Sequence, residues 1–175
     1  MRIIAGRWRG RKLVTPPGPA TRPTSDRARE ALFSMLASRI GSFEGLRVAD
    51  LFAGSGALGL EALSRGAAHC VFVDKDRAAT EAIRANLAAL GASGEVLPGA
   101  AEHIRVPGPL DLAFLDPPYG SGLASAALER LPLAPGGLAS VETGRDERVA
   151  AEGYEEDAVR TYGKAKITLL RRRAE

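Results

Sequence analysis

The chain contains few residues that could bind a metal through sulfur or imidazole. Its 175 residues include one cysteine, Cys70, and two histidines, His69 and His103. A single cysteine excludes an internal disulfide, and so few cysteines and histidines offer no metal-ligand spacing. We therefore expect no metal, a reducing cytoplasmic location, a core position for Cys70, and surface or strand-edge positions for both histidines.

Long apolar runs are also missing. No stretch approaches the roughly 20 residues that span a bilayer. The opening MRIIAGRWRG carries charge but lacks the continuous apolar region of a signal peptide. The length suits one substantial core and is short for two. The sequence thus predicts a single domain over residues 1–175, acting as a monomer without a membrane partner.

Charge is unevenly distributed along the chain. Residues 1–29 contain eight Arg or Lys and one acid, and residues 160–175 contain six and one. The residues between them contain ten basic and nineteen acidic side chains, although the net charge is only +3. Two basic ends around an acidic middle suggest a bound nucleic acid, and Trp8 offers a surface for base stacking. The alternative is ordinary solvated charge.

The apolar pattern alternates between strands and helices. A first helix is expected to begin near Thr24 or Ser25 and to end at Gly41. Near-continuous apolar strands separated by helices predict the α/β class, with a mainly parallel sheet covered by helices on both faces. The expected strands are 46–52, 69–74, 94–99, 111–116 and 136–143, and the expected helices are 56–66, 77–91 and 121–131.

Both ends of the chain depart from this alternation. Residues 153–173 contain two strand patterns that turn near Gly163 without a helix, which predicts a C-terminal antiparallel hairpin. The first seventeen residues contain two apolar and basic stretches broken by glycines, which predict an N-terminal β-hairpin. We therefore divide the domain into a basic hairpin extension, residues 1–20, and a Rossmann-like core, residues 21–175.

A glycine-rich loop follows the first core strand. Gly54, Gly56 and Gly59 have GxGxxG spacing between a predicted strand and a predicted helix, so the backbone can turn sharply and approach a ligand. Asp74 ends the next strand, where a carboxylate can bind both hydroxyls of a ribose. Together they predict a nucleoside site, although a tight strand-to-helix turn followed by an unrelated surface acid would have the same sequence pattern.

The ribose contact alone fits a dinucleotide or S-adenosylmethionine. Asp50 lies four residues before Gly54 and places a carboxylate at the mouth of the loop. That charge would oppose a pyrophosphate but would attract the ammonium group of a methionine moiety. The sequence therefore favours S-adenosyl-L-methionine as the cofactor.

The segment LDPPYG ends the fourth core strand. Pro117 and Pro118 remove two backbone donors, so strand pairing stops after Asp116. Parallel strands place this segment near the glycine loop, where the Asp116 carboxylate and the Pro117 carbonyl could accept both N–H groups of an exocyclic base amine. Tyr119 could stack on that base. The pattern predicts methyl transfer to an amino group.

These motifs resemble a known family along nearly the whole chain. RIIAGRWRGRKL, RPTSDRAREALF, DLFAGSGALGLEALSRGA and DPPY occur in this order. They resemble the RsmD-type guanine-N2 methyltransferases of bacterial 16S ribosomal RNA, which are class I S-adenosylmethionine-dependent enzymes. The resemblance implies a seven-stranded sheet of order 3-2-1-4-5-7-6, and ribosomal RNA or an assembling small subunit as the partner.

The resemblance also implies roles for individual residues. The catalytic set is Asp116, Pro117, Pro118 and Tyr119. The cofactor-binding set is Asp50, Phe52, Ala53, Gly54, Gly56, Asp74, Lys75, Ala101 and Asp116. The RNA-binding set is Arg7, Arg9, Arg11, Lys12, Arg22 and Arg29. The family often has an acid or amide beside the adenine, whereas this chain has Ala100 and Ala101, so backbone groups and packing are expected to hold that ring.

Three other functions stay open at the level of sequence. An adenine-N6 methyltransferase would share DPPY but not the two N-terminal motifs. An NAD-dependent oxidoreductase would need an acid and base pair near a hydride site, which the sequence does not display. A noncatalytic RNA-binding module would leave DPPY without a purpose.

Overall fold

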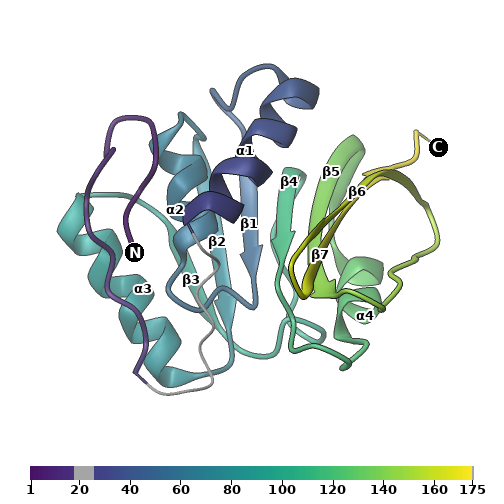
Figure 1. Cartoon of the computed structure of the whole chain (residues 1–175). Coiled ribbons are helices and arrows are strands. Elements are labelled where there is room, and N and C mark those ends of the chain that lie inside the picture. Colours follow the sequence, from purple (N-terminus) through teal and green to yellow (C-terminus); the bar gives the residue numbers. More distant parts are fainter. Residues whose placement is uncertain (18–25, 175) are drawn as a thin grey trace.

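The computed structural model describes residues 1–17 and 26–174, so the predicted caps Thr24 and Ser25 lie outside the described residues. Helices and strands alternate as the sequence predicts (Figure 1). The helices are α1 (Asp26–Ile40), α2 (Ala57–Ser64), α3 (Arg77–Leu90) and α4 (Leu123–Arg130). The strands are β1 (Arg47–Leu51), β2 (His69–Asp74), β3 (Glu95–Pro98), β4 (Leu110–Leu115), β5 (Leu133–Gly144), β6 (Tyr154–Tyr162) and β7 (Ala165–Arg172).

All seven strands form one sheet of order β3-β2-β1-β4-β5-β7-β6. The pairs from β3 to β5 are parallel, whereas β7 is antiparallel to both β5 and β6. The predicted strand order and the C-terminal hairpin are therefore confirmed. The order reverses between β1 and β4, and in such sheets ligands bind beyond the carboxyl ends of the strands at that point.

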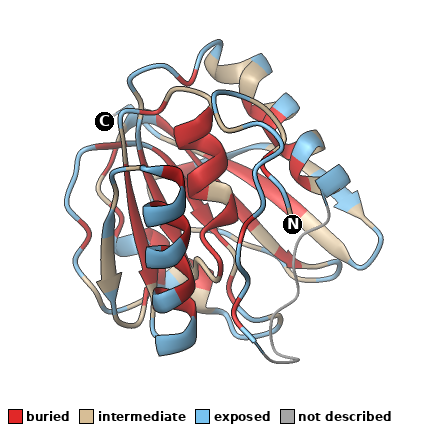
Figure 2. Ribbon diagram, turned by 90° about the vertical axis from the view of Figure 1, so that its left-hand side faces the viewer, coloured by how far each residue is buried: buried red, intermediate tan, exposed pale blue. Residues whose placement is uncertain are grey.

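The core has two parts, one on each face of the sheet. On one face, α1, α2 and α3 pack through Leu36, Leu60 and Ile83 against strand residues that include Phe72 and Phe114. On the other face, α4 packs through Ala127 and Leu128. Figure 2 shows buried residues concentrated on the strands and on the inner sides of the helices. Both faces are thus covered, as expected of strands that are apolar on both sides.

The N-terminal segment, residues 1–17, folds back on itself beside α2 and α3. It forms one β-bridge, between Arg2 and Lys12, rather than two full strands. Ile3 and Leu13 are buried in the core on the sheet face that α1, α2 and α3 cover. The Asn86 side chain of α3 accepts a hydrogen bond from the Val14 amide and donates one to the Val14 carbonyl. The N-terminal segment therefore contributes apolar residues to the core of the sheet face that α1, α2 and α3 cover.

The buried carboxylate of Glu61 anchors the same segment. It accepts hydrogen bonds from the amides of Ile4 and Ala5 at 2.9 and 3.0 Å. It also pairs with Arg65 at 2.9 Å and with Arg29 at 3.4 Å. One fully buried side chain of α2 therefore holds the N-terminal segment, α1 and its own helix together.

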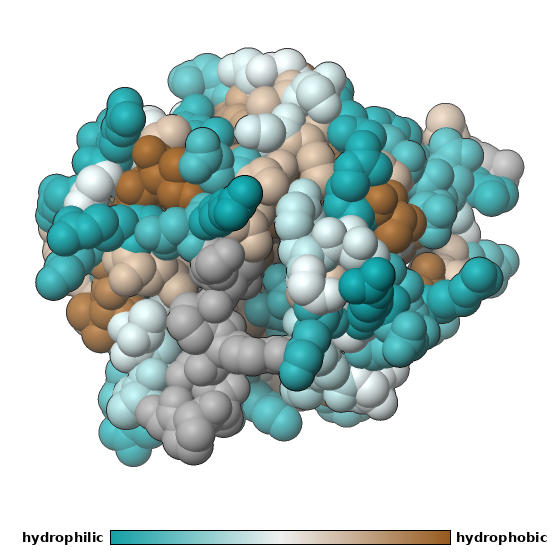
Figure 3. All heavy atoms as spheres, viewed as in Figure 1, coloured by the Kyte–Doolittle hydropathy of each residue, from teal (hydrophilic) through white to brown (hydrophobic). Residues whose placement is uncertain are grey.

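None of the helices in the described part of the chain is both long and apolar enough to cross a membrane. Hydrophilic side chains dominate the face shown in Figure 3, where apolar atoms are confined to separate patches.

Candidate active site

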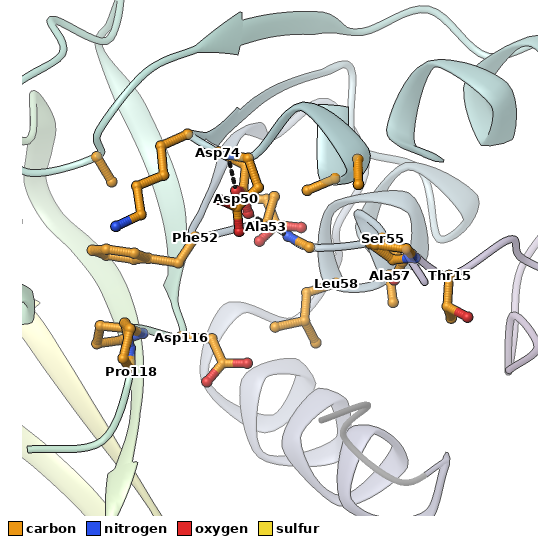
Figure 4. A pocket seen from close by; sticks show the side chains of 18 of the residues that line it. Thr15, Asp50, Phe52, Ala53, Ser55, Ala57, Leu58, Asp74, Asp116 and Pro118 are labelled. Carbon is orange, nitrogen blue, oxygen red and sulfur yellow. Dashed lines mark hydrogen bonds between the residues drawn. The ribbon is translucent and has the colours of Figure 1, made fainter. Parts of the chain in front are cut away.

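A cavity of about 630 Å³ opens at the carboxyl ends of the central strands. Its lining includes Asp50 and Phe52 at the end of β1, Asp74 at the end of β2, and Asp116 directly after β4. Figure 4 shows Phe52 between the Asp50 and Asp74 carboxylates on one side and Asp116 with Pro118 on the other. These four residues, which the sequence assigns to the cofactor and the substrate, therefore share one cavity.

The three glycines of the loop have different structural roles. Gly54 is left-handed, with φ of 60°, and a Cβ there would meet no atom within 4 Å, so the backbone leaves room for a ligand. A Cβ on Gly59 would come within 2.5 Å of the Phe72 ring and 2.6 Å of the Cys70 sulfur. Gly59 therefore permits close packing of α2 on β2. Gly56, predicted to bind the cofactor, is buried with φ of 81° and does not line the cavity.

The half-buried carboxylate of Asp74 shapes the loop. Its two oxygens accept hydrogen bonds from the amides of Gly54 and Asp76, each at 2.9 Å. Burial raises the pKa of Asp74, and these two amide bonds oppose that shift. A carboxylate has about four acceptor positions, so both oxygens can also accept hydrogen bonds from a ligand in the cavity. The geometry suits a vicinal diol such as that of a ribose.

Asp50 lies deeper than the sequence suggested. Its side chain lines the cavity, but the residue is only 2% exposed and accepts a hydrogen bond from the Gly59 amide at 2.9 Å. Burial raises the pKa of Asp50 to about 8, against the effect of the Gly59 bond, and the nearby Asp74 raises it further. A positive charge placed beside Asp50 would favour its ionised form, so this position attracts a cation.

Phe52 has a backbone conformation that is unusual for its residue type. Its φ is 58°, and no other non-glycine residue of the described ranges has a positive φ. Strain of this kind persists only where the surrounding structure fixes it. Here it brings a half-buried ring into the cavity, between the carboxylates of Asp50 and Asp74 and that of Asp116.

The segment after β4 lines the other end of the cavity. Asp116, Pro117, Pro118 and Tyr119 all contribute to the lining. The amide of Asp116 still bonds the Leu51 carbonyl of β1 at 3.4 Å, and the Pro118 carbonyl accepts the hydroxyl of Ser121 at 2.7 Å. The prolines thus end strand pairing where predicted, and the chain turns at once into α4.

Glu147 braces this segment against β5. Its two carboxylate oxygens accept hydrogen bonds from the amides of Gly120 and Gly144 at 2.8 and 2.6 Å. Tyr119 lies beside Gly144, and its hydroxyl donates to the Glu142 carboxylate at 3.2 Å. The turn after Asp116 is therefore tied to the end of the neighbouring strand at two points.

The remaining predicted cofactor residues lie along the cavity wall. Ala53 and Lys75 line it, with Lys75 exposed, and Ala100 and the buried Ala101 line it from the loop after β3. Glu102 of the same loop also contributes, although no pattern in the sequence distinguishes it from a surface acid.

The predicted RNA-binding residues do not form one cluster. Arg7, Arg9, Arg11 and Lys12 are exposed around the turn of the N-terminal segment. Figure 1 places that turn at the upper left, whereas the carboxyl ends of the parallel strands point to the bottom. Arg11 also donates to the Ala89 carbonyl of α3 at 2.8 Å, and Arg7 stacks on Trp8.

The other two predicted RNA contacts differ from that group. Arg22 lies outside the described residues. Arg29 has no exposed surface, and its guanidinium bonds the Arg2 carbonyl and the Asp26 carboxylate at 2.6 Å each. Arg29 also contributes to the lining of the cavity, so its assignment to RNA stays a prediction.

The sequence predicts no metal site and a core position for Cys70. Among the residues that the structure describes, no group of three or more histidine, cysteine or acidic side chains could hold a metal ion. Cys70 is a buried free cysteine, as expected, with its pKa raised by burial.

Comparison with known proteins identifies the family. A family model described as "Conserved hypothetical protein 95" matches residues 1–171. Ribosomal RNA small subunit methyltransferase D of Escherichia coli is 46% identical over 134 residues, which is 75% of this chain and 66% of the relative. This chain belongs to the RsmD-type family. The match spans just under two thirds of that relative's length.

Solved structures extend the RsmD-type resemblance to the fold. The structure of yhhF from Escherichia coli has a TM-score of 0.86 and 36% identity, and the alignment covers 100% of this chain and 99% of that one. The Thermus thermophilus 16S rRNA N2 G1207 methyltransferase RsmC, in complex with AdoMet and guanosine, has a TM-score of 0.66 and 25% identity, over 90% of this chain and 46% of that one. The fold is that of class I methyltransferases.

Proposed function

We propose that this chain methylates the exocyclic N2 amine of a guanine in small-subunit ribosomal RNA, with S-adenosylmethionine as the methyl donor. The observation that carries the proposal is the meeting of Asp50 and Asp74 with the Asp116–Tyr119 segment in one cavity. Two relatives support it. The Escherichia coli relative is named for small-subunit rRNA methylation, and RsmC is described as an N2 guanine enzyme bound to AdoMet and guanosine.

The residues present fit this cofactor. Asp74 offers acceptors for the two ribose hydroxyls, and the buried Asp50 favours a neighbouring cation such as an ammonium or sulfonium. A dinucleotide would instead place a pyrophosphate near Asp50, and that repulsion disfavours it. Phe52, Ala53, Gly54, Lys75 and Ala101 would form the remaining walls. When bound, the cofactor supplies an electrophilic methyl group on a positively charged sulfur.

The chain's own residues orient the amine. An exocyclic nitrogen of guanine is a poor nucleophile because its lone pair is delocalised into the ring. We assign its two N–H groups to the Asp116 carboxylate and the Pro117 carbonyl, which turns the lone pair toward the methyl group. The nitrogen would attack the donated methyl group with that lone pair and would then release one N–H proton to water, while Asp116 positions the amine.

The remaining substrate contacts follow from position. The Tyr119 ring is assigned to stack on the guanine, and the rigid prolines limit the conformational freedom of the carbonyl that holds the amine. Arg7, Arg9, Arg11 and Lys12 are assigned to phosphates of the RNA, because they are exposed together on one turn. The partner is then ribosomal RNA or an assembling small subunit, met in the cytoplasm.

One experiment tests the donor, the base and the position together. Purified protein is incubated with S-adenosylmethionine and with naked small-subunit RNA or small subunits from a bacterium that lacks its own RsmD-type gene. Mass spectrometry of nucleosides should detect N2-methylguanosine, and primer-extension mapping should find one modified nucleotide. Formation of N6-methyladenosine, or no methylation by a protein that binds S-adenosylmethionine in calorimetry, would contradict the proposal.

A further inference from the structure

Glu142 is a second carboxylate at the substrate end of the cavity, and neither the sequence motifs nor the proposed chemistry uses it. It lines the cavity and is half buried. It lies two residues before the end of β5, the strand next to β4. Its side chain is therefore placed by the sheet rather than by a loop.

The register of the sheet puts Glu142 beside Asp116. Leu115 of β4 pairs with Val141 of β5 in parallel, so the next residues on the two strands are Asp116 and Glu142. Neighbouring strands lie about 4.8 Å apart, and residues in register point to the same face. Asp116 follows β4 directly, two residues after Phe114, and its amide still bonds the Leu51 carbonyl of β1. Glu142 is two residues after Ser140 on β5, so strand alternation places both acids on the face of Phe114.

Tyr119 ties Glu142 to the segment after β4. Its hydroxyl donates to Oε2 of Glu142 at 3.2 Å, so Glu142 is held toward the segment that begins with Asp116. The Glu147 carboxylate, which accepts from the amides of Gly120 and Gly144, joins the turn after β4 to the end of β5. Asp116 and Glu142 therefore both line the cavity from neighbouring strand ends, and Glu147 stabilises the backbone behind them.

Two adjacent carboxylates match two adjacent donors on guanine. Its Watson–Crick edge carries the N1–H group next to the N2 amine, whereas adenine has an unprotonated acceptor at N1 beside its N6 amine. We propose that Glu142 accepts the N1–H of the target guanine while Asp116 accepts from N2, so that Glu142 selects guanine over purines with an acceptor at N1. This inference rests on the proposed function, because it assumes that the substrate is a guanine amine.

The selection follows from charge as well as from geometry. A carboxylate only accepts hydrogen bonds, so an unprotonated N1 would place two acceptors against each other in a partly closed cavity. Sites built to bond a particular polar group reject analogues that lack it far more strongly than apolar pockets reject a missing methylene. Glu142 would thus discriminate between bases that Tyr119 stacks equally well.

The test uses 2-aminopurine, which keeps the amine at position 2 but has an unprotonated N1. Synthetic fragments of small-subunit RNA carry either guanine or 2-aminopurine at the nucleotide that primer extension identifies, and are assembled into subunits if naked RNA is not methylated. Wild-type protein should methylate guanine at least about a hundredfold faster, in kcat/KM, than 2-aminopurine. Glu142→Gln should lower that ratio at least tenfold, because an amide can accept from N1–H or donate to a bare N1.

Tyr119→Phe is the matched control. It removes the hydroxyl that bonds Glu142 but leaves the carboxylate, so it should lower the rates on both bases and leave their ratio near the wild-type value. A Glu142→Gln ratio equal to that of wild type, or a Tyr119→Phe ratio that falls as far as that of Glu142→Gln, would overturn the inference while the proposed function stands. Wild-type protein that methylates neither base at N2 would overturn both.

Discussion

The Oδ2 atom of Asp74 accepts a hydrogen bond from the backbone amide of Gly54 at 2.9 Å, so the acid at the end of β2 supports the turn after β1. Asp74→Ala should weaken S-adenosylmethionine binding by about 1.5 to 3 kcal/mol, the usual range for hydrogen bonds to a charged group. Titration calorimetry measures the change. Asp74→Asn, which can still accept from Gly54, should lose less, and unchanged affinity in both variants would contradict the ribose assignment.

Substitution of Asp116 should separate cofactor binding from the methyl-transfer step. If Asp116 holds the amine chiefly as the new bond forms, Asp116→Ala should lower turnover by roughly a hundredfold or more, with far less change in cofactor affinity. Single-turnover methylation and calorimetry on the same preparation measure the two effects. Asp116→Asn should be milder because an amide oxygen still accepts one hydrogen bond. An Asn variant as inactive as Ala would instead indicate that Asp116 accepts a proton.

The buried Asp50 should make cofactor binding depend on pH. Its pKa of about 8 means that the ligand-free protein must lose a proton from Asp50 before this site can hold a cation as a charged pair. S-adenosylmethionine affinity should therefore rise with pH toward about 8 and level off above it, until the amino group of the ligand itself titrates. Calorimetry in buffers of different ionisation enthalpy should detect proton release on binding near pH 7.

Asp50→Asn is the control for that dependence. Because the folded-state pKa of Asp50 lies above the unfolded value, the neutral acid favours folding fully below about pH 4, and this contribution is lost as pH rises to about 8. The Asn variant should bind the cofactor weakly with a flatter pH profile, and at pH 8 it should be more stable than wild type by at least about 1 kcal/mol. A less stable variant would contradict the burial argument.

The turn of the N-terminal segment allows a test of RNA binding. Replacing Arg7, Arg9 and Lys12 with glutamine spares Arg11, which bonds α3, so the fold should persist. If each side chain binds a phosphate, the log-log slope of RNA affinity against salt should fall by about 0.7 to 0.9 for each phosphate that is no longer bound. Glutamine at the exposed Arg84, Arg105 and Arg130 is a charge-matched control that should change the slope far less. Equal slopes in the two triple variants would rule out a specific role for this turn.

The Glu61 network predicts a large effect on stability. Glu61→Ala would remove one of the two carboxylates that pair with the buried Arg29 and would leave two backbone amides without acceptors, and breaking a buried ion pair typically costs about 3 to 5 kcal/mol. Urea denaturation should show the loss in the free energy of unfolding. Glu81→Ala is the control, because its pair with Arg77 is exposed on α3 and should contribute little. A loss no larger than that of Glu81→Ala would show that the Glu61 carboxylate does not contribute to holding the N-terminal segment.

Much of the fold could be predicted because the sheet is buried on both faces. Near-continuous apolar runs such as the one ending at Asp116 identify the strands, and the glycine loop fixes where a ligand approaches. The boundaries were less accurate where packing decides them. β5 begins at Leu133 rather than near Gly136, through a bulged pairing with β4 that residue types alone do not indicate.

Residues of the candidate site could be predicted where a local sequence motif marks them. They could not be predicted where only the pairing of neighbouring strands brings them to the cavity. Asp50, Asp74 and Asp116 each lie next to a recognisable turn, and all three line the cavity. Glu142 follows an ordinary apolar strand and becomes informative only once β4 and β5 are paired in register. A helical pattern likewise does not reveal that Arg29 turns inward to meet the buried carboxylate of Glu61.

The two hydrogen bonds by which Glu147 joins Gly120 to Gly144 lower the entropy cost of binding a base at this end of the cavity. A loop that is mobile before binding must lose conformational entropy when its ligand arrives, at about 0.5 to 1.5 kcal/mol for each side chain that becomes ordered. Here the turn after Asp116 is already fixed to the sheet through both oxygens of one carboxylate. Under the proposed function, the energy of stacking and hydrogen bonding would then be available for moving the nucleotide out of its RNA rather than for ordering the protein.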